Sequence, residues 1–214
     1  VHSGELGIVG LDNIQDLIAY SARVSNPSNQ ANTKTTSKLL GYLIKHKHWS
    51  PFEMASACIE IETTRDIARQ LLRHRSFSFQ EFSQRYADIR DLDDSIVLRK
   101  ARLQDEKNRQ NSVITDDINL HMNWEQHQKI VWAAAMKAYK WAIDNGIAKE
   151  QARVVLPEGN TQSRLYVNGT IRSWIHYIEL RSANGTQKEH MDLAKAVAEA
   201  ITKIFPTVKE YVNE

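Results

Sequence analysis

The sequence is poor in the features that mark secreted, disordered or membrane proteins. Cys58 is the single cysteine among 214 residues, which excludes an intrachain disulfide and favours a reducing, cytoplasmic compartment. Only four prolines occur and 42% of the residues are hydrophobic, a composition typical of a globular protein. No apolar run reaches membrane-spanning length and no secretory segment opens the chain, so we expect no membrane partner.

Several chemical signatures are missing as well. The chain contains no G-x-G-x-x-G, no Walker loop and no G-x-S-x-G, so a conventional Rossmann or P-loop site is not supported. The 28 basic and 26 acidic residues nearly balance, which argues against a protein that coats nucleic acid. His46 and His48 would diverge by about 200° on a helix, and the other histidines lack ligand spacing, so we predict no metal site.

The sequence does contain a dense group of anion-binding side chains in residues 73–86. This run holds three arginines, one histidine, one carboxylate and three serines. Guanidiniums bind phosphates in a bidentate manner and serine hydroxyls complete such a shell, so the run predicts a cradle for a phosphate or a nucleotide. A solvated basic surface is the alternative interpretation.

The hydrophobic spacing predicts a helix-rich chain with mixed structure. Helices are expected over about residues 14–22, 36–47, 124–144, 170–181 and 187–205, and a further helix capped by Thr63 or Thr64 ends just before Arg73. Residues 54–62 alternate apolar and polar side chains, which indicates a half-buried strand with Cys58 on its polar side. In the helix over 124–144 the predicted buried stripe is Val131, Ala134, Ala135, Ala138 and Trp141.

The organisation along the chain indicates one domain. No repeat, low-complexity tract or composition break divides residues 1–214, so we predict a single domain. Residues 88–119 carry dense mixed charge with little periodicity, for which we predict a solvated arm or irregular insert without a chemical role.

The helix over 170–181 combines an apolar stripe with a polar one. Ile171, Trp174, Ile175 and Ile178 have core spacing, while Arg172, His176 and Glu179 line another face. Arg181 continues the apolar stripe, where a buried guanidinium needs an anion or a set of carbonyls. An arginine that extends into solvent at the helix end is the alternative.

These residues together resemble a known family. Arg73-His74-Arg75, then Ser78, Ser83 and Arg85, resemble the signature R-H-R-x-x-S-x-x-x-x-S-x-R of the flavin-dependent thymidylate synthases. The resemblance covers nearly the whole chain outside the charged arm. It also rests on residues 21–25, 48–53, 68–70, 150–157, 172–173, 180–181 and 187–189.

The resemblance implies a fold, an assembly and a reaction. It implies α+β subunits, helix-rich with a small, largely antiparallel sheet, which assemble as a homotetramer with active sites between chains. Such enzymes hold FAD beside dUMP and convert dUMP to dTMP. The carbon donor is 5,10-methylenetetrahydrofolate, NADPH reduces the flavin, and the flavin supplies the hydride.

The same resemblance assigns residues to the two ligands. The FAD residues are Ser50, Arg73, His74, Arg75, Glu81, Arg172 and His176. The dUMP residues are Gln70, Arg73, Glu81, Ser83, Gln84, Arg85, Arg153 and Arg181. Whether Asn168 or Thr170 matches the flavin-binding asparagine of the family stays open.

Arg181 matches the catalytic arginine of the family. An arginine cannot act as a general base, because its pKa stays above about 12. Its role is therefore electrostatic: it polarises uracil for methylation at C5 and hydride addition at C6, a contribution of about 3–4 kcal/mol. The family uses no cysteine nucleophile, so Cys58 is assigned no catalytic role.

Two alternatives come from other classes of protein. The chain could be a non-catalytic nucleotide-binding or nucleic-acid-binding module in which Arg73, Arg75 and Arg85 contact phosphates. It could also be a structural oligomer whose arginines form interfacial ion pairs. Neither alternative predicts a bound flavin.

Overall fold

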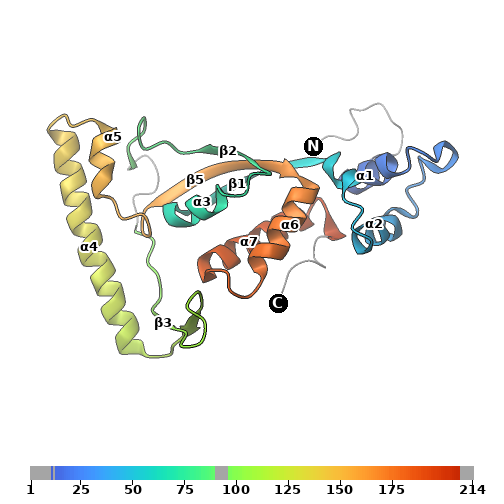
Figure 1. Cartoon of the computed structure of the whole chain (residues 1–214). Helices are drawn as coiled ribbons and strands as arrows, with labels where there is room; N and C mark the ends of the chain where they lie inside the picture. The colour runs from blue at the N-terminus through green and yellow to red at the C-terminus, as the bar shows by residue number, and fades with distance from the viewer. Residues whose placement is uncertain (1–10, 12, 90–95, 208–214) are drawn as a thin grey trace.

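The chain folds into an α+β structure in which helices dominate (Figure 1). The structure is a computed structural model, and it describes residue 11, residues 13–89 and residues 96–207. The helices are α1 (Ile14–Ala22), α2 (Thr36–Lys45), α3 (Arg65–Leu71), α4 (Ile118–Asp144), α5 (Lys149–Ala152), α6 (Ile171–Ser182) and α7 (Lys188–Thr202), with short 3-10 turns η2 (Pro27–Asn29), η3 (Ser50–Glu53) and η5 (Arg153–Val155). The strands are β1 (Ser56–Thr64), β2 (Ser78–Glu81), β3 (Arg102–Gln104), β4 (Ser112–Ile114) and β5 (Gln162–Thr170). The predicted helix-rich α+β class is confirmed.

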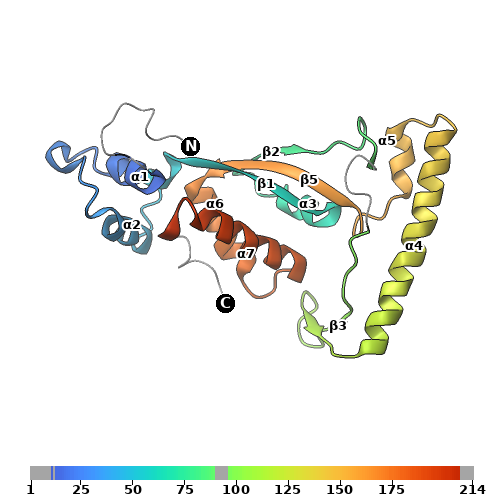
Figure 2. The same cartoon turned by 180° about the vertical axis from the view of Figure 1, so that it is seen from behind.

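A three-stranded antiparallel sheet lies at the centre, with β5 between β1 and β2. Ser56 pairs with Thr170 at one end of β1, and Ser78 of β2 pairs with Asn168 on the other side of β5. Helices α3, α6 and α7 lie on one side of this sheet in both opposite views (Figures 1 and 2). The other face carries exposed side chains, including Cys58, so the predicted alternation of the strand is confirmed.

The main core forms between the sheet and α6. The four residues of the predicted apolar stripe are all fully buried: Ile171, Trp174, Ile175 and Ile178. Trp174 also donates a hydrogen bond from Nε1 to the carbonyl oxygen of Ala57, at 3.0 Å. Thr170 caps the helix, because its side chain accepts from the backbone N–H of Ser173. The core therefore fixes the direction in which α6 presents its polar side.

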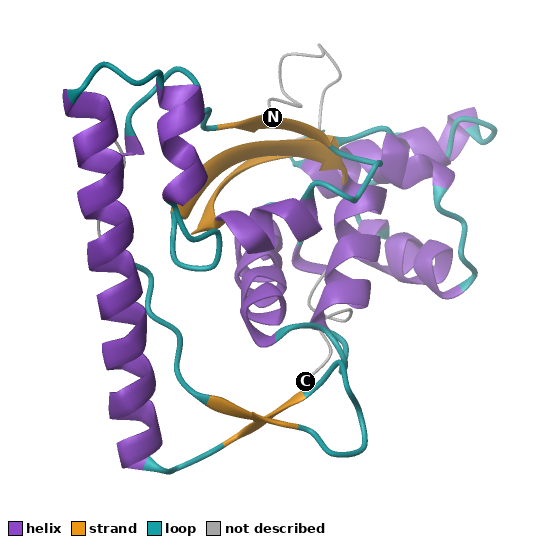
Figure 3. Cartoon of the chain, turned by 60° about the vertical axis from the view of Figure 1, so that its left-hand side comes forward, coloured by secondary structure: helices purple, strands orange, loops and turns teal. Residues whose placement is uncertain are grey.

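The charged arm differs from its prediction. The segment contains a hairpin of β3 and β4 (Figure 3), whose register pairs Arg102 with Ile114. Residues 90–95 lie outside the described residues. Arg99 Nη2 lies 2.7 Å from Asp66 Oδ1, and Arg102 Nη1 lies 2.7 Å from Glu189 Oε1. Most of the described side chains from Lys100 to Asn119 are exposed, as a solvated arm requires, but the hairpin and the two ion pairs are order that the prediction of an irregular insert lacked. Charge runs look solvated while their partners, here on α3 and α7, are distant in the sequence.

Helix α4 is longer than predicted, and a different face of it is buried. It begins at Ile118 because the Asp117 side chain accepts from the backbone N–H of Leu120. Of the predicted stripe only Ala135 is buried, while Val131 and Trp141 are 54% and 61% exposed. The buried positions are Gln128, Ala135, Tyr139 and Ala142. Helix α4 stands at one end of the molecule (Figures 1 and 2), so the single chain leaves most of its apolar surface uncovered.

Candidate active site

The arginine-rich run starts at a turn that a buried aromatic ring holds in place. Backbone N–H groups of His74 and Phe77 donate to the carbonyl oxygens of Leu71 and His74, which reverses the chain after α3. Phe77 is buried, and its ring centroid lies 4.4 Å from that of Trp174. Arg73 and Arg75 flank this turn with exposed side chains, and no carboxylate of the described residues pairs with either.

The turn places His74 against Arg181 at the end of α6. Arg181 Nε donates to His74 Nε2 at 2.9 Å. Burial, and then the positive charge of Arg181, lowers the pKa of His74 to about 4. His74 is therefore neutral near pH 7, with its proton on Nδ1, and Nε2 is free to accept. The contact fixes the Nε edge of the guanidinium, and neither Nη nitrogen has a protein partner in the described part of the chain, so both can bind a ligand.

The first turns of α6 form a second group of polar residues. Arg172 forms an ion pair with Glu53 of η3, and the exposed Ser50 begins the same 3-10 turn. His176 lies edge-on to Trp49, with ring centroids 4.6 Å apart. Burial, and then the charge of Arg172, lowers the pKa of His176. The polar stripe predicted for α6 is thus present; Arg172 and His176 are half-buried and Glu179 is exposed.

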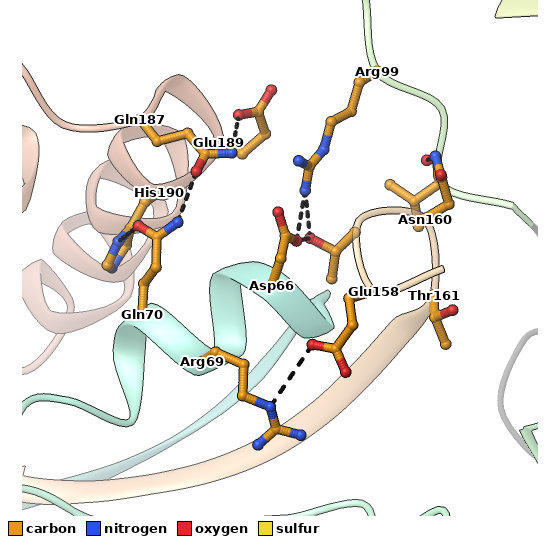
Figure 4. Close-up of polar contacts among 12 residues, drawn as sticks. Asp66, Arg69, Gln70, Arg99, Glu158, Asn160, Thr161, Gln187, Glu189 and His190 are labelled. Atoms are coloured by element: carbon orange, nitrogen blue, oxygen red, sulfur yellow. Dashed lines mark hydrogen bonds and ion pairs between the residues drawn. The ribbon is translucent and has the colours of Figure 1, made fainter. Parts of the chain in front are cut away.

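Gln70, at the end of α3, reaches the start of α7. Its Nε2 donates to Gln187 Oε1 at 2.7 Å, and its Oε1 lies 3.1 Å from His190 Nδ1. His190 is fully buried. Figure 4 shows these side chains converging from α3 and α7.

Glu81 lies at the end of β2, among basic side chains of α3. Its Oε2 is 3.1 Å from Arg69 Nη1, and its Oε1 is 3.7 Å from Arg65 Nη1. Ser163 Oγ donates to Oε1 at 2.9 Å. Glu81 is thus held by residues of its own chain beside the open edge of the site.

The remaining predicted dUMP residues form a separate group near α5. Arg85 Nε lies 3.5 Å from Glu150 Oε2, and Arg153 Nε donates to the carbonyl oxygen of Glu150 at 3.3 Å. Ser83 Oγ accepts from the backbone N–H of Arg85 at 3.4 Å. No contact joins this group to Arg181 within the described residues. Figure 1 shows α5 beside α4, away from the end of α6.

Buried polar atoms that lack a partner among the described residues occur both in the group near α5 and in the group around Arg181. Gln84, which is 3% exposed, has an Nε2 without a partner in the described part of the chain. The same holds for Tyr177 Oη and His190 Nε2 near Arg181. A buried polar atom of this kind is costly unless a ligand or water satisfies it.

Sequence reasoning missed several polar residues around Gln70 and the arm. These are Asp66, Arg99, Arg102, Tyr177, Gln187, Glu189 and His190. Residues 187–189 contribute to the family resemblance, but the resemblance assigns them to no ligand. His190 carried no signal, because a lone histidine in an amphipathic helix looks like a surface residue.

The donor set fits a phosphorylated dinucleotide cofactor such as FAD. Arg73 and Arg75 are exposed cations without carboxylate partners among the described residues, and such guanidiniums suit a pyrophosphate. Across the described ranges, no group of three or more His, Cys, Asp or Glu side chains is arranged to hold a metal ion. None of the helices described here has the length and apolar character that crossing a membrane requires.

Fold and site together define a class: a helix-rich α+β protein that gathers guanidiniums and a neutral histidine at the edge of a small antiparallel sheet. The family described as thymidylate synthase complementing protein matches residues 8–207. This chain belongs to that family, the flavin-dependent thymidylate synthases. The resemblance read from the arginine-rich run is therefore confirmed.

Individual relatives agree with this membership. A probable flavin-dependent thymidylate synthase of Paramecium bursaria Chlorella virus 1 is 52% identical over 206 residues, which covers 96% of this chain and 94% of the relative. The flavin-dependent thymidylate synthase of a Synechocystis species is 50% identical over 194 residues and covers 91% and 87%. The crystal structure of the UMP/dUMP methylase PolB from Streptomyces cacaoi with 5-Br dUMP has a TM-score of 0.80 at 27% identity, covering 92% of this chain and 89% of that one.

Proposed function

We propose that this chain is an enzyme that methylates dUMP reductively to dTMP, with 5,10-methylenetetrahydrofolate as the carbon donor. FAD, reduced by NADPH, supplies the hydride in this proposal. The observation that carries it is Arg181, which a neutral His74 holds by Nε at 2.9 Å while neither Nη nitrogen has a partner among the described residues. The likeness to a UMP/dUMP methylase supports the choice of substrate.

Arg181 acts on the uracil ring by its charge. The methylation requires negative charge to develop over N3 and O4 as C5 becomes nucleophilic. A guanidinium fixed before the reaction stabilises that charge without having to reorient. Because burial and Arg181 itself keep His74 neutral, His74 positions the guanidinium without opposing it by a second charge.

The flavin is held in this proposal by residues of the turn, β2, η3 and α6. They are Ser50, Arg73, His74, Arg75, Glu81, Arg172 and His176. The exposed guanidiniums bind its phosphates, and the neutral rings of His74 and His176 offer uncharged hydrogen-bonding surfaces beside it. The ion pair between Arg172 and Glu53 keeps the Arg172 side chain in place at the site.

The dUMP residues are Gln70, Arg73, Glu81, Ser83, Gln84, Arg85, Arg153 and Arg181. In one chain Arg85 and Arg153 form a group apart from Arg181. We infer that Arg85 and Arg153 of one chain, which would bind the phosphate of dUMP, complete the site that Arg181 of another chain forms for the uracil ring, within a homotetramer. Each subunit is a single domain in the cytoplasm in this interpretation.

The first test of this proposal is the visible absorption spectrum of the protein. Purified protein should show the visible absorption of an oxidised flavin, and NADPH should bleach it in the absence of oxygen. Addition of dUMP and methylenetetrahydrofolate should then yield dTMP, measured by chromatography. A protein that binds FAD but forms no dTMP contradicts the enzyme proposal. A colourless protein that binds RNA or DNA with steep loss of affinity in salt supports the binding module instead.

A further inference from the structure

We propose that Glu189 and Arg102 orient the side-chain amide of Gln70 through a directed chain of hydrogen bonds, and so act as positioning residues for the uracil nucleotide. The inference rests on the proposed function, in which Gln70 contacts dUMP. It assigns a role to the arm, because Arg102 belongs to β3.

The contacts run without a break from Arg102 of the arm to Gln70 of α3, and Figure 4 shows the part that joins Glu189, Gln187 and Gln70. Arg102 donates to Glu189 from two nitrogens, Nη1 to Oε1 at 2.7 Å and Nη2 to Oε2 at 2.9 Å. Gln187 Nε2 lies 3.0 Å from Glu189 Oε2, and Gln70 Nε2 lies 2.7 Å from Gln187 Oε1. His190 Nδ1 completes the chain at 3.1 Å from Gln70 Oε1.

The charge of Glu189 fixes the direction of every bond in this chain. A carboxylate only accepts, so Gln187 must turn its NH2 group toward Glu189. The oxygen of Gln187 then faces Gln70 and accepts from its NH2 group. The oxygen of Gln70 therefore faces His190, which must carry its proton on Nδ1.

Burial and neighbouring charges keep Glu189 and His190 in the protonation states that this series of hydrogen bonds requires. Burial opposes ionisation of Glu189, but hydrogen bonds from Arg102, Gln187 and its own backbone N–H, with the charge of Arg102, lower its pKa to about 2. Burial, then the charges of Arg181 and His74, lowers the pKa of His190 to about 4. Near pH 7 Glu189 is a carboxylate and His190 is a neutral ring.

A fixed amide presents a fixed pattern to a ligand. Gln70 has two N–H donors and two oxygen lone pairs, and the chain uses one of each. One donor and one acceptor remain, at defined ends of the amide. A pyrimidine edge carries donors and acceptors at set positions, so a reversed amide would face it with the wrong groups.

The carboxylate variant Glu189→Gln tests the proposal, because it keeps the shape and removes the charge that sets direction. We expect the KM for dUMP to rise about tenfold, the effect of losing one hydrogen bond. We expect kcat and the flavin spectrum to change little. Glu199→Gln, an exposed glutamate on the same helix, is the control and should match the unaltered enzyme.

A double-mutant cycle with Gln70→Ala separates positioning from a general loss of structure. If Glu189 acts through Gln70, Glu189→Gln should not raise the KM further in the Gln70→Ala background. Additive effects, or a KM for Glu189→Gln within twofold of the unaltered enzyme, overturn the inference. Failure of the unaltered protein to form dTMP would instead sink the proposed function, so the two failures are distinct.

Discussion

At the scale of residues, the proposed chemistry depends on the hydrogen bond between Arg181 and His74. Arg181→Lys keeps a positive charge but loses the Nε–H that donates to His74. We expect kcat to fall by about 10²–10³ for Arg181→Ala, and by a smaller factor for Arg181→Lys. Steady-state dTMP formation measures this. Arg109→Ala, at an exposed position of the β3–β4 loop, should keep full turnover. A fully active Arg181→Ala would refute the role.

The half-buried His74 and the fully buried His190 should make stability depend on pH. The pKa values of His74 and His190 are about 4 in the fold, below the ordinary value of 6.5. As the pH falls from about 6.5 toward 4.5, the unfolded chain binds protons that the folded chain does not, so the free energy of unfolding decreases. Above 6.5 this effect disappears.

The matched variants for this prediction are His190→Gln and His46→Gln, the second at an exposed position. Denaturation at a series of pH values should show a slope reduced by roughly one bound proton for His190→Gln. His46→Gln should keep the slope of the unaltered protein. Equal slopes in all three proteins would contradict the assignment.

At the scale of elements, strand β5 meets the turn after α3 at a glycine. A Cβ on Gly169 would lie 2.3 Å from Phe77 Cδ1, and Phe77 packs against Trp174. We expect Gly169→Ala to lower the free energy of unfolding by about 1–3 kcal/mol, because the ring must leave its place. The displaced turn should also weaken flavin binding.

Gly41 offers the matched control within α2. A Cβ there meets nothing within 4 Å, and helical Ala is favoured over Gly by about 1 kcal/mol. Gly41→Ala should therefore be neutral or slightly stabilising in urea denaturation. If Gly169→Ala is equally well tolerated, the packing argument for the turn fails.

How far the sequence predicts an element depends on where its partners lie. Helix α6 was predicted with its core residues because its period of about 3.6 residues is written in its own segment. The ion pairs of the arm could not be predicted, because Arg99 and Arg102 lie far in the sequence from their partners Asp66 and Glu189. In α4, Ala135 alone of the predicted stripe is buried, since few elements of the same chain cover the helix.

The site shows the same limit. The motif spacing identified Arg73, His74 and Arg75. The helical pattern over 170–181 singled out Arg181, and the family resemblance gave this arginine its catalytic role. The pairing of His74 with Arg181, 107 residues apart, required the fold. His190 was missed because its partner Gln70 is 120 residues away.

At the scale of the whole molecule, α4 exposes a large apolar surface that a soluble single chain rarely leaves uncovered. Its exposed large apolar side chains are Ile118, Leu120, Met122, Trp124, Ile130, Val131 and Trp141. We expect the protein in solution to have four times the 24.6 kDa of one chain, with α4 in the contacts between subunits.

Val131→Glu tests this assembly. Val131 is 54% exposed in one chain, so in a monomer the change should alter stability by no more than about 0.5 kcal/mol. In the assembly it would bury an unpaired charge and shift the protein toward smaller species. Sedimentation velocity measures the outcome. Lys129→Gln, which removes the surface pair with Glu125, should leave the mass unchanged. A monomer in every case contradicts the proposal.

The order of strands in the sheet also has a consequence for how the chain reaches its fold. Strands β1 and β2 come early in the sequence but pair with β5, not with each other. Neither strand can pair until residues 162–170, which form β5, are available. Sheet formation therefore depends on the closure of long loops, which is slow relative to helix formation. During synthesis the arginine-rich run leaves the ribosome well before its partner strand, and the site takes shape only when nearly the whole chain has emerged.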